Sequence, residues 1–163
     1  MGKKLESMKK LFQYQFEYND WANELIINTL LNIKSLPENS VKIISHIICT
    51  QDIWLDRVIG SSDYTFSIWE EYSIYECLAL SKLSTEKWLN YLKRASEKEI
   101  RSEFQYENAE DEYIEFTLER AISHIITHSS YHRGQINLAL RLEGKIPPKT
   151  DVIYFPGFTV ENE

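Results

Sequence analysis

The chain has 163 residues, 43% of them hydrophobic and 26% charged, a length that suits a single domain over residues 1–163 with one ordinary core. With 25 acidic and 18 basic residues the formal net charge is −7, which repels phosphate backbones and argues against a nucleic-acid or anionic-membrane partner. No stretch approaches the roughly 18 apolar residues of a membrane span, and the N-terminus lacks a signal peptide's apolar core, so a cytoplasmic location is expected.

The first half of the chain predicts two long amphipathic helices. Over residues 5–34 apolar positions recur at intervals of three and four, and Pro37 follows the expected end. Asn39 and Ser40 form a suitable N-cap for a second helix, which continues until Gly60 provides a C-terminal stop.

The second half of the chain predicts two more helices around a hairpin. A third helix is expected from about residue 73 to residue 96. Residues 103–117 are typical of a short β-hairpin, because aromatic and apolar residues flank the polar run 108–111. Thr117 is then the cap of a last helix over residues 118–143.

This series of elements predicts the fold class. Gly144, Pro147 and Pro148 end the last helix, and residues 151–158 are expected to be an extended tail that packs back on the body. Four long helices indicate an all-α four-helix bundle with a short β-hairpin before the last helix. Cys49 and Cys77 lie in apolar helical stretches without CxxC spacing, which predicts buried free thiols in a reducing compartment.

The four histidines are the main candidates for chemistry. His124, His128 and His132 follow one another at intervals of four on the predicted last helix, and His46 lies on the second. Residues four apart lie one turn above each other and can share an ion, whereas residues eight apart are separated by about 12 Å and roughly 80° of rotation. Either adjacent pair can therefore join His46 in a three-nitrogen metal site, and spacing leaves both pairs open. The alternative is that these are hydrogen-bonded core histidines, which is the commoner role of a single histidine on an apolar helix face.

Three segments resemble a known family. The sequence HIITHSSYHRGQ at residues 124–135, with YNDWAN at 18–23 and HIICTQDIW at 46–54, is similar to the DinB/YfiT-like superfamily of metal-binding four-helix proteins. The resemblance covers nearly the whole chain. It implies that His46, His128 and His132 are the metal ligands, and so favours the second of the two adjacent pairs.

Other residues of these segments receive supporting roles. Gln135 is expected to orient an imidazole or a metal-bound water, and Arg133 to form an ion pair or cap a loop. Trp54 is a candidate wall of the pocket. A structural role is expected for Tyr18, Asn19, Trp21 and Asn23. Trp21 is expected in the core, and the two asparagines are expected to link the first helix to its neighbours.

The expected function follows from the three-histidine site. Three imidazoles suit several divalent ions, with zinc or nickel expected first, and leave a coordination position open. The resemblance implies a metal-dependent thiol S-transferase that uses a low-molecular-weight thiol such as bacillithiol or mycothiol, and also a homodimer. The alternatives are a metal-dependent hydrolase and a non-catalytic metal-binding or stress-response protein.

Overall fold

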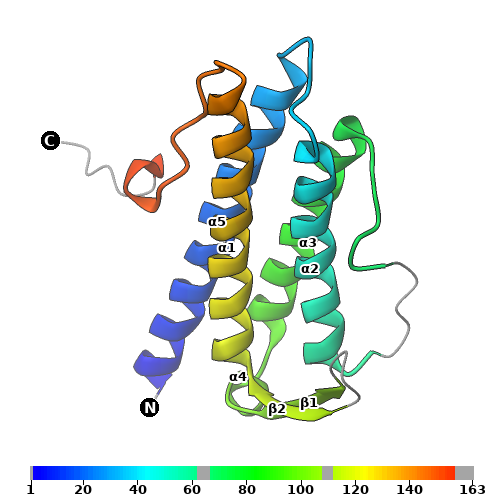
Figure 1. The fold of residues 1–163 in the computed structure, drawn as a ribbon. Helices are drawn as coiled ribbons and strands as arrows, with labels where there is room; N and C mark the ends of the chain where they lie inside the picture. Colours follow the sequence, from blue (N-terminus) through cyan, green and yellow to red (C-terminus); the bar gives the residue numbers. More distant parts are fainter. Residues whose placement is uncertain (1, 62–66, 108–111, 157–163) are drawn as a thin grey trace, which may run out of the picture.

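The computed structural model describes residues 2–61, 67–107 and 112–156, and its four long helices form a bundle (Figure 1). These are α1 (Gly2–Leu31), α2 (Ser40–Ile59), α3 (Ile74–Arg94) and α5 (Leu118–Leu142). In Figure 1, α1 and α5 run upward and α2 and α3 run downward. The four predicted helices are confirmed, each within a few residues of its expected bounds.

A short helix and a two-stranded hairpin close one end of the bundle (Figure 1). Helix α4 (Glu97–Ile100) starts at a capping box, in which the Ser96 hydroxyl accepts from the Glu99 backbone N–H and the Glu99 carboxylate accepts from that of Ser96. The strands β1 (Glu103–Glu107) and β2 (Tyr113–Thr117) pair antiparallel, with Phe104 opposite Phe116. The predicted hairpin is confirmed, and its polar run 108–111 lies outside the described residues.

The helix ends show why these residues start and stop helices. The Thr117 hydroxyl accepts from the Arg120 backbone N–H and so caps α5 as predicted. Gly60 ends α2 with φ 71°, a left-handed conformation that glycine adopts without penalty. Asn39 stands at the N-cap of α2 but makes no side-chain cap there, because its own backbone is left-handed with φ 61°.

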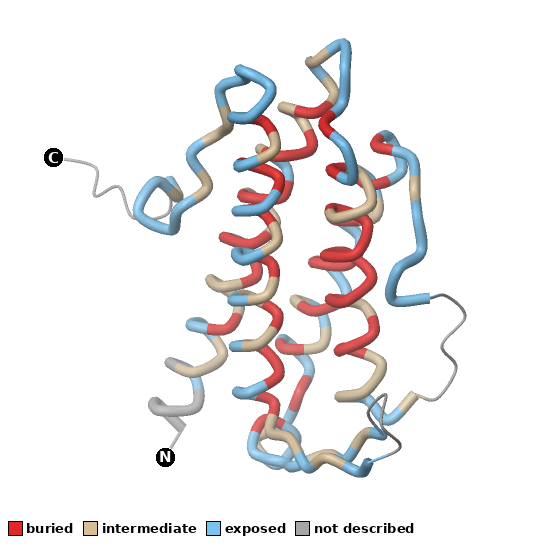
Figure 2. The backbone as a smooth tube through the Cα atoms, in the orientation of Figure 1, coloured by how far each residue is buried: buried red, intermediate tan, exposed pale blue. Residues whose placement is uncertain are grey.

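Buried residues occur on all four long helices (Figure 2). They form two apolar clusters with a polar layer between them. The cluster at the hairpin end contains Phe16, Trp54 and Trp88, and the cluster at the other end contains Ile26 and Ile47. Between them, all four helices contribute buried polar side chains, namely Asn19, Asn23, Gln51, Ser81, Ser84, Thr85, Ser129 and Arg133.

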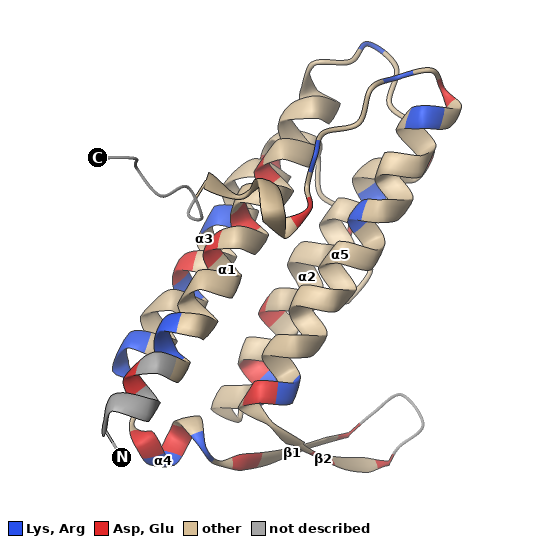
Figure 3. Cartoon of the chain, turned by 90° about the vertical axis from the view of Figure 1, so that its left-hand side faces the viewer, with Lys and Arg blue, Asp and Glu red and all other residues tan. Residues whose placement is uncertain are grey.

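The surface departs from the periodic pattern at several leucines. Leu11, Leu78 and Leu83 are exposed although they keep helical spacing. On α1, Lys9 and Lys10 lie toward the N-terminal end, and the charged residues beyond them are all acidic, namely Glu17, Asp20 and Glu24. Figure 3 shows the charged residues by colour. Within the described ranges, no helix is both long and apolar enough to cross a bilayer.

The described part of the predicted tail, residues 151–156, is less extended than expected, and residues 157–158 lie outside the described residues. Val152–Tyr154 form a 3₁₀ turn, η1, because Tyr154 and Phe155 donate backbone hydrogen bonds back to Asp151 and Val152. Phe155 then packs against three aromatic rings of α1, those of Tyr14, Tyr18 and Trp21. Trp21 is half-buried under this tail rather than part of the interior.

Candidate metal centre

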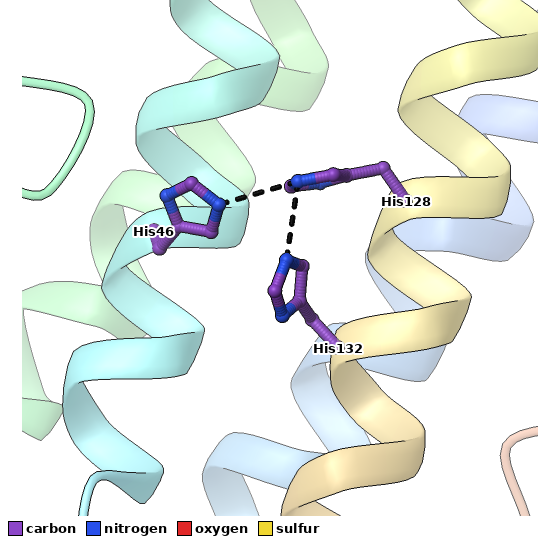
Figure 4. Close-up of side chains that lie close together, drawn as sticks. All are labelled: His46, His128 and His132. Carbon is purple, nitrogen blue, oxygen red and sulfur yellow. Dashed lines mark hydrogen bonds between the residues drawn. The ribbon is translucent and has the colours of Figure 1, made fainter.

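Two helices bring three histidines together at the level of the polar layer. His46 lies in the buried stretch of α2, and His128 and His132 lie one turn apart on the side of α5 that faces it (Figure 4). A search of the described residues for His, Cys, Asp or Glu side chains that could share an ion finds these three, whose ligand atoms all lie within 4.8 Å of one another.

The distances between the imidazole nitrogens suit a shared ion. The Nε2 of His128 lies 3.2 Å from that of His46 and 3.1 Å from that of His132. Nitrogens bound at 2.0–2.1 Å to a tetrahedral zinc lie about 3.3 Å apart. These two distances are therefore close to the spacing in a coordination sphere, and the ligand atoms of all three residues lie within 4.8 Å of one another.

Hydrogen bonds at the far side of two rings determine where their lone pairs point. The Nδ1 of His46 lies 2.8 Å from the Ile68 carbonyl oxygen, which only accepts, so this nitrogen carries the proton and Nε2 keeps its lone pair. The Nδ1 of His132 donates in the same way to Gln135 Oε1 at 2.7 Å. Two lone pairs thus face His128 Nε2, which can donate at most one hydrogen. A bound cation satisfies all three nitrogens, so the donor set fits a metal.

Burial favours the neutral form of His46 and His128, the form that binds a metal. Burial lowers the pKa of His128 from 6.5 to about 3, with the neighbouring histidines adding to the effect. It also lowers the pKa of His46, although the hydrogen bond to Ile68 acts in the opposite direction. Both imidazoles are therefore uncharged at neutral pH, with lone pairs available.

His124 is not part of this cluster. It lies one turn below His128, where its ring is 5.2 Å from that of His128 and 5.0 Å from that of Trp54, centroid to centroid. The structure thus brings His46 together with His128 and His132, the set implied by the family resemblance. That these residues bind a metal remains a prediction.

The aromatic wall of the site differs from the prediction. Trp54 packs against Phe104, Tyr106 and Phe116 of the hairpin and touches His124, so it does not cover the three ligand candidates. Trp69 covers His46 instead, with ring centroids 3.7 Å apart and planes 8° apart.

Two aromatic residues at the site were missed from the sequence. Trp69 is 47% exposed and lies in a segment outside the helices, where no periodicity indicates its role. Tyr131 is also exposed and contacts His132 with centroids 5.1 Å apart. Its position directly before a ligand candidate was the one available signal.

Arg133 has a different role from the one predicted. Instead of an ion pair or a loop cap, its guanidinium is buried and donates to Asn19 Oδ1 at 2.6 Å, Asn23 Oδ1 at 2.8 Å and the Tyr18 hydroxyl at 3.4 Å. Asn19 in turn donates to Gln51 Oε1 of α2 at 2.9 Å. The prediction that Asn19 and Asn23 link α1 to its neighbours is confirmed.

The cysteines are free and buried, as predicted, and lie outside the group of ligand candidates. Burial raises the pKa of Cys49 to about 11 and raises that of Cys77 as well. Both therefore remain neutral thiols, which are poor metal ligands.

Comparison with known proteins identifies the family of this chain. The DinB family model matches residues 1–163. A curated relative, "Protein DinB" of Bacillus subtilis (strain 168), is 24% identical over 153 residues, covering 83% of this chain and 88% of that protein. On the match of the family model over its whole length, the chain belongs to the DinB family.

Proposed function

We propose that this protein binds one divalent metal ion through the Nε2 atoms of His46, His128 and His132, and that the loaded protein is an enzyme of the thiol S-transferase type. One observation carries the proposal: three nitrogens converge, and in the described part of the chain no fourth ligand side chain joins them. Structural zinc sites are normally closed by four protein ligands, whereas catalytic sites have three and keep a position open.

Neutral ligands make this open position attractive to an anion. A divalent ion held by three uncharged imidazoles supplies its full positive charge, which lowers the pKa of a small thiol toward neutrality. Thiolate is a soft ligand that suits zinc and other late divalent ions. A thiol is therefore favoured over water as the activated group.

The surrounding residues hold the site in one geometry. The Ile68 carbonyl and Gln135 fix the orientation of the His46 and His132 rings through their Nδ1 atoms. The indole of Trp69 lies flat on His46 and excludes water from that side. Such fixed ligands need little reorganisation when a substrate arrives.

The test is a thiol titration of cobalt-substituted protein, followed by visible spectroscopy. Glutathione and bacillithiol are expected to produce a saturable sulfur-to-cobalt charge-transfer band that His46→Ala lacks. His124→Ala is the matched control and should retain the band. If no thiol produces a band while azide or acetate still perturbs the spectrum, the thiol proposal is wrong and a hydrolase is favoured.

Chelation separates a catalytic site from a structural one. A catalytic site predicts a folded metal-free protein, because the two apolar clusters pack without the ion. A large loss of melting temperature on chelation, with neither thiol nor azide changing the cobalt spectrum, would instead indicate a metal that only fastens α2 to α5.

A further inference from the structure

A cavity lies between α1 and α3, away from the metal centre. In Figure 3 these two helices run along one side of the bundle, and α2 and α5, which carry the three histidines, run along the other. The cavity has a volume of about 390 Å³, and small-molecule sites in proteins occupy about 300–1,000 Å³. All of its described lining comes from α1 and α3, so it is a separate space from the candidate metal site.

The lining changes from acidic to apolar along the cavity. On α1, Asp20, Glu24 and Ile27 recur at intervals of four and three, so they share one side of the helix. Helix α3 runs in the opposite direction (Figure 1), so Tyr75 and Leu78, near its start, lie toward Ile27 and away from Asp20. Ile27 is buried, whereas Tyr75 and Leu78 are exposed, so the apolar end has a closed wall and an open rim.

Ser81 contributes an unused hydrogen-bond donor to this lining. It is 4% exposed, and its Oγ accepts from Asn23 Nδ2 at 3.5 Å. In the part of the chain that the structure describes, its O–H has no acceptor. A buried donor without an acceptor costs free energy, so a bound group that accepts from Ser81 is favoured.

The acidic end has an excess of negative charge. Asp20 and Glu24 line it together with a single base, Lys82, whose ammonium forms no ion pair with either carboxylate among the described residues. Burial raises the pKa of Asp20 and Glu24 adds to the effect, although Lys82 and a hydrogen bond with Thr85 act in the opposite direction. A cation bound beside the two carboxylates offsets the cost of holding these charges together.

We propose that this cavity binds a small primary amine that carries a hydroxyl and an apolar body; the proposal does not depend on the metal site. The ammonium lies beside Asp20 and Glu24, where its hydrogen bonds are charge-assisted. The hydroxyl accepts from Ser81, and the apolar body lies against Ile27 and Leu78. An anion of the same shape is excluded, because it would meet two carboxylates.

The test compares three probes of one shape by calorimetry at neutral pH. They are 2-amino-1-phenylethanol, the neutral 1-phenyl-1,2-ethanediol and the anion mandelate. The amine should bind with a dissociation constant in the millimolar range or below, as expected for about ten non-hydrogen atoms. The diol should bind at least about tenfold more weakly, because it lacks the charge-assisted contacts, and mandelate should not bind.

Two sets of variants assign the binding to this cavity. Asp20→Asn/Glu24→Gln should weaken binding of the amine at least about tenfold and leave that of the diol within about twofold. Glu17→Gln/Glu38→Gln is the matched control, because it removes two exposed carboxylates that do not line the cavity, and it should leave both affinities within about twofold. Ala79→Phe places a ring in the cavity from an exposed position of its lining, so it should abolish binding without loss of helix content.

Several results would overturn the proposal. The wild type might bind no amine, or bind the diol as tightly as the amine, which would indicate an apolar cavity without preference for charge. Equal weakening by the control variant would indicate a general effect of surface charge, and undiminished binding by Ala79→Phe would indicate a site elsewhere. His46→Ala should bind the amine as tightly as the wild type, and loss of binding there would contradict the independence of the two sites.

Discussion

Replacing Arg133 with methionine tests the buried polar layer that joins α1 to α5. The methionine chain occupies much of the volume of the arginine stem but donates no hydrogen bonds. The substitution leaves Asn19 Oδ1 and Asn23 Oδ1 without the donors that now lie 2.6 and 2.8 Å away. Arg133 is 1% exposed, so water cannot replace those donors unless the packing opens.

Opposing effects determine the size of the loss. Each orphaned buried amide oxygen costs about 1–3 kcal/mol. Burial lowers the pKa of Arg133, which shows that the buried charge itself costs free energy that methionine recovers in part. Removing one member of a buried network is nevertheless destabilising as a rule. We therefore expect Arg133→Met to lower the free energy of unfolding by about 2–4 kcal/mol, from the total of about 5–15 kcal/mol that is typical of a domain.

The assay is urea denaturation of metal-free protein followed by circular dichroism. The exposed Arg141→Met is the control and should change the free energy of unfolding by less than about 0.5 kcal/mol. The double variant Arg133→Met/Asn23→Leu should lose less than the sum of the single losses, because one orphaned oxygen is removed. If the unfolding free energies of Arg133→Met and wild type differ by less than about 0.5 kcal/mol, this account of the polar layer is refuted.

Three further predictions concern pH, the aromatic cover and a helix cap. Because folding lowers the pKa of His128 from 6.5 to about 3, the unfolded chain takes up the proton at higher pH than the folded chain, and the metal-free protein should lose stability as the pH falls from about 7 toward 3. Urea titrations at several pH values should show that the unfolding free energy of His128→Leu depends less steeply on pH than that of wild type. An equal pH dependence would contradict the lowered pKa of His128. Cobalt should quench the tryptophan fluorescence of wild-type protein, and most of this quenching should be lost in Trp69→Phe, because Trp69 stacks on His46. Undiminished quenching in the variant would indicate that the ion binds elsewhere. Ser73→Ala should cost about 1 kcal/mol in the unfolding free energy, because the Ser73 hydroxyl accepts from the Glu76 backbone N–H, and a stability equal to wild type would contradict the capping role.

The helices and their ends were predictable because their signals are local. Apolar spacing defined α1, α2, α3 and α5, and Gly60 and Thr117 mark ends by their own backbone or side-chain chemistry. Asn39 shows the limit of such signals. Its residue type predicts a cap, but its backbone is left-handed and its side chain makes no cap hydrogen bond.

The site was predictable only in part, because it depends on how the helices are rotated against each other. Spacing alone placed either pair of neighbouring histidines on one face of α5, and only packing against α2 brings His128 and His132, rather than His124, near His46. The family resemblance supplied this choice.

Long-range contacts account for the errors at Arg133 and Trp69. An arginine is usually exposed, so its residue type did not predict that Arg133 would be buried. Asn19 and Asn23 lie one turn apart on the buried side of α1, and this spacing was the indirect sign of a shared buried partner. Trp69 lies outside any periodic segment, and its stacking on His46 spans 23 residues of sequence.

The most direct test of the central proposal is the metal content of tag-free protein and its four histidine variants, measured by plasma mass spectrometry after dialysis. Wild type and His124→Ala should each retain about one divalent ion per chain, whereas His46→Ala, His128→Ala and His132→Ala should retain almost none, because each removes one of three converging Nε2 atoms. Retention of the ion by His132→Ala together with its loss from His124→Ala would contradict the proposed ligand set.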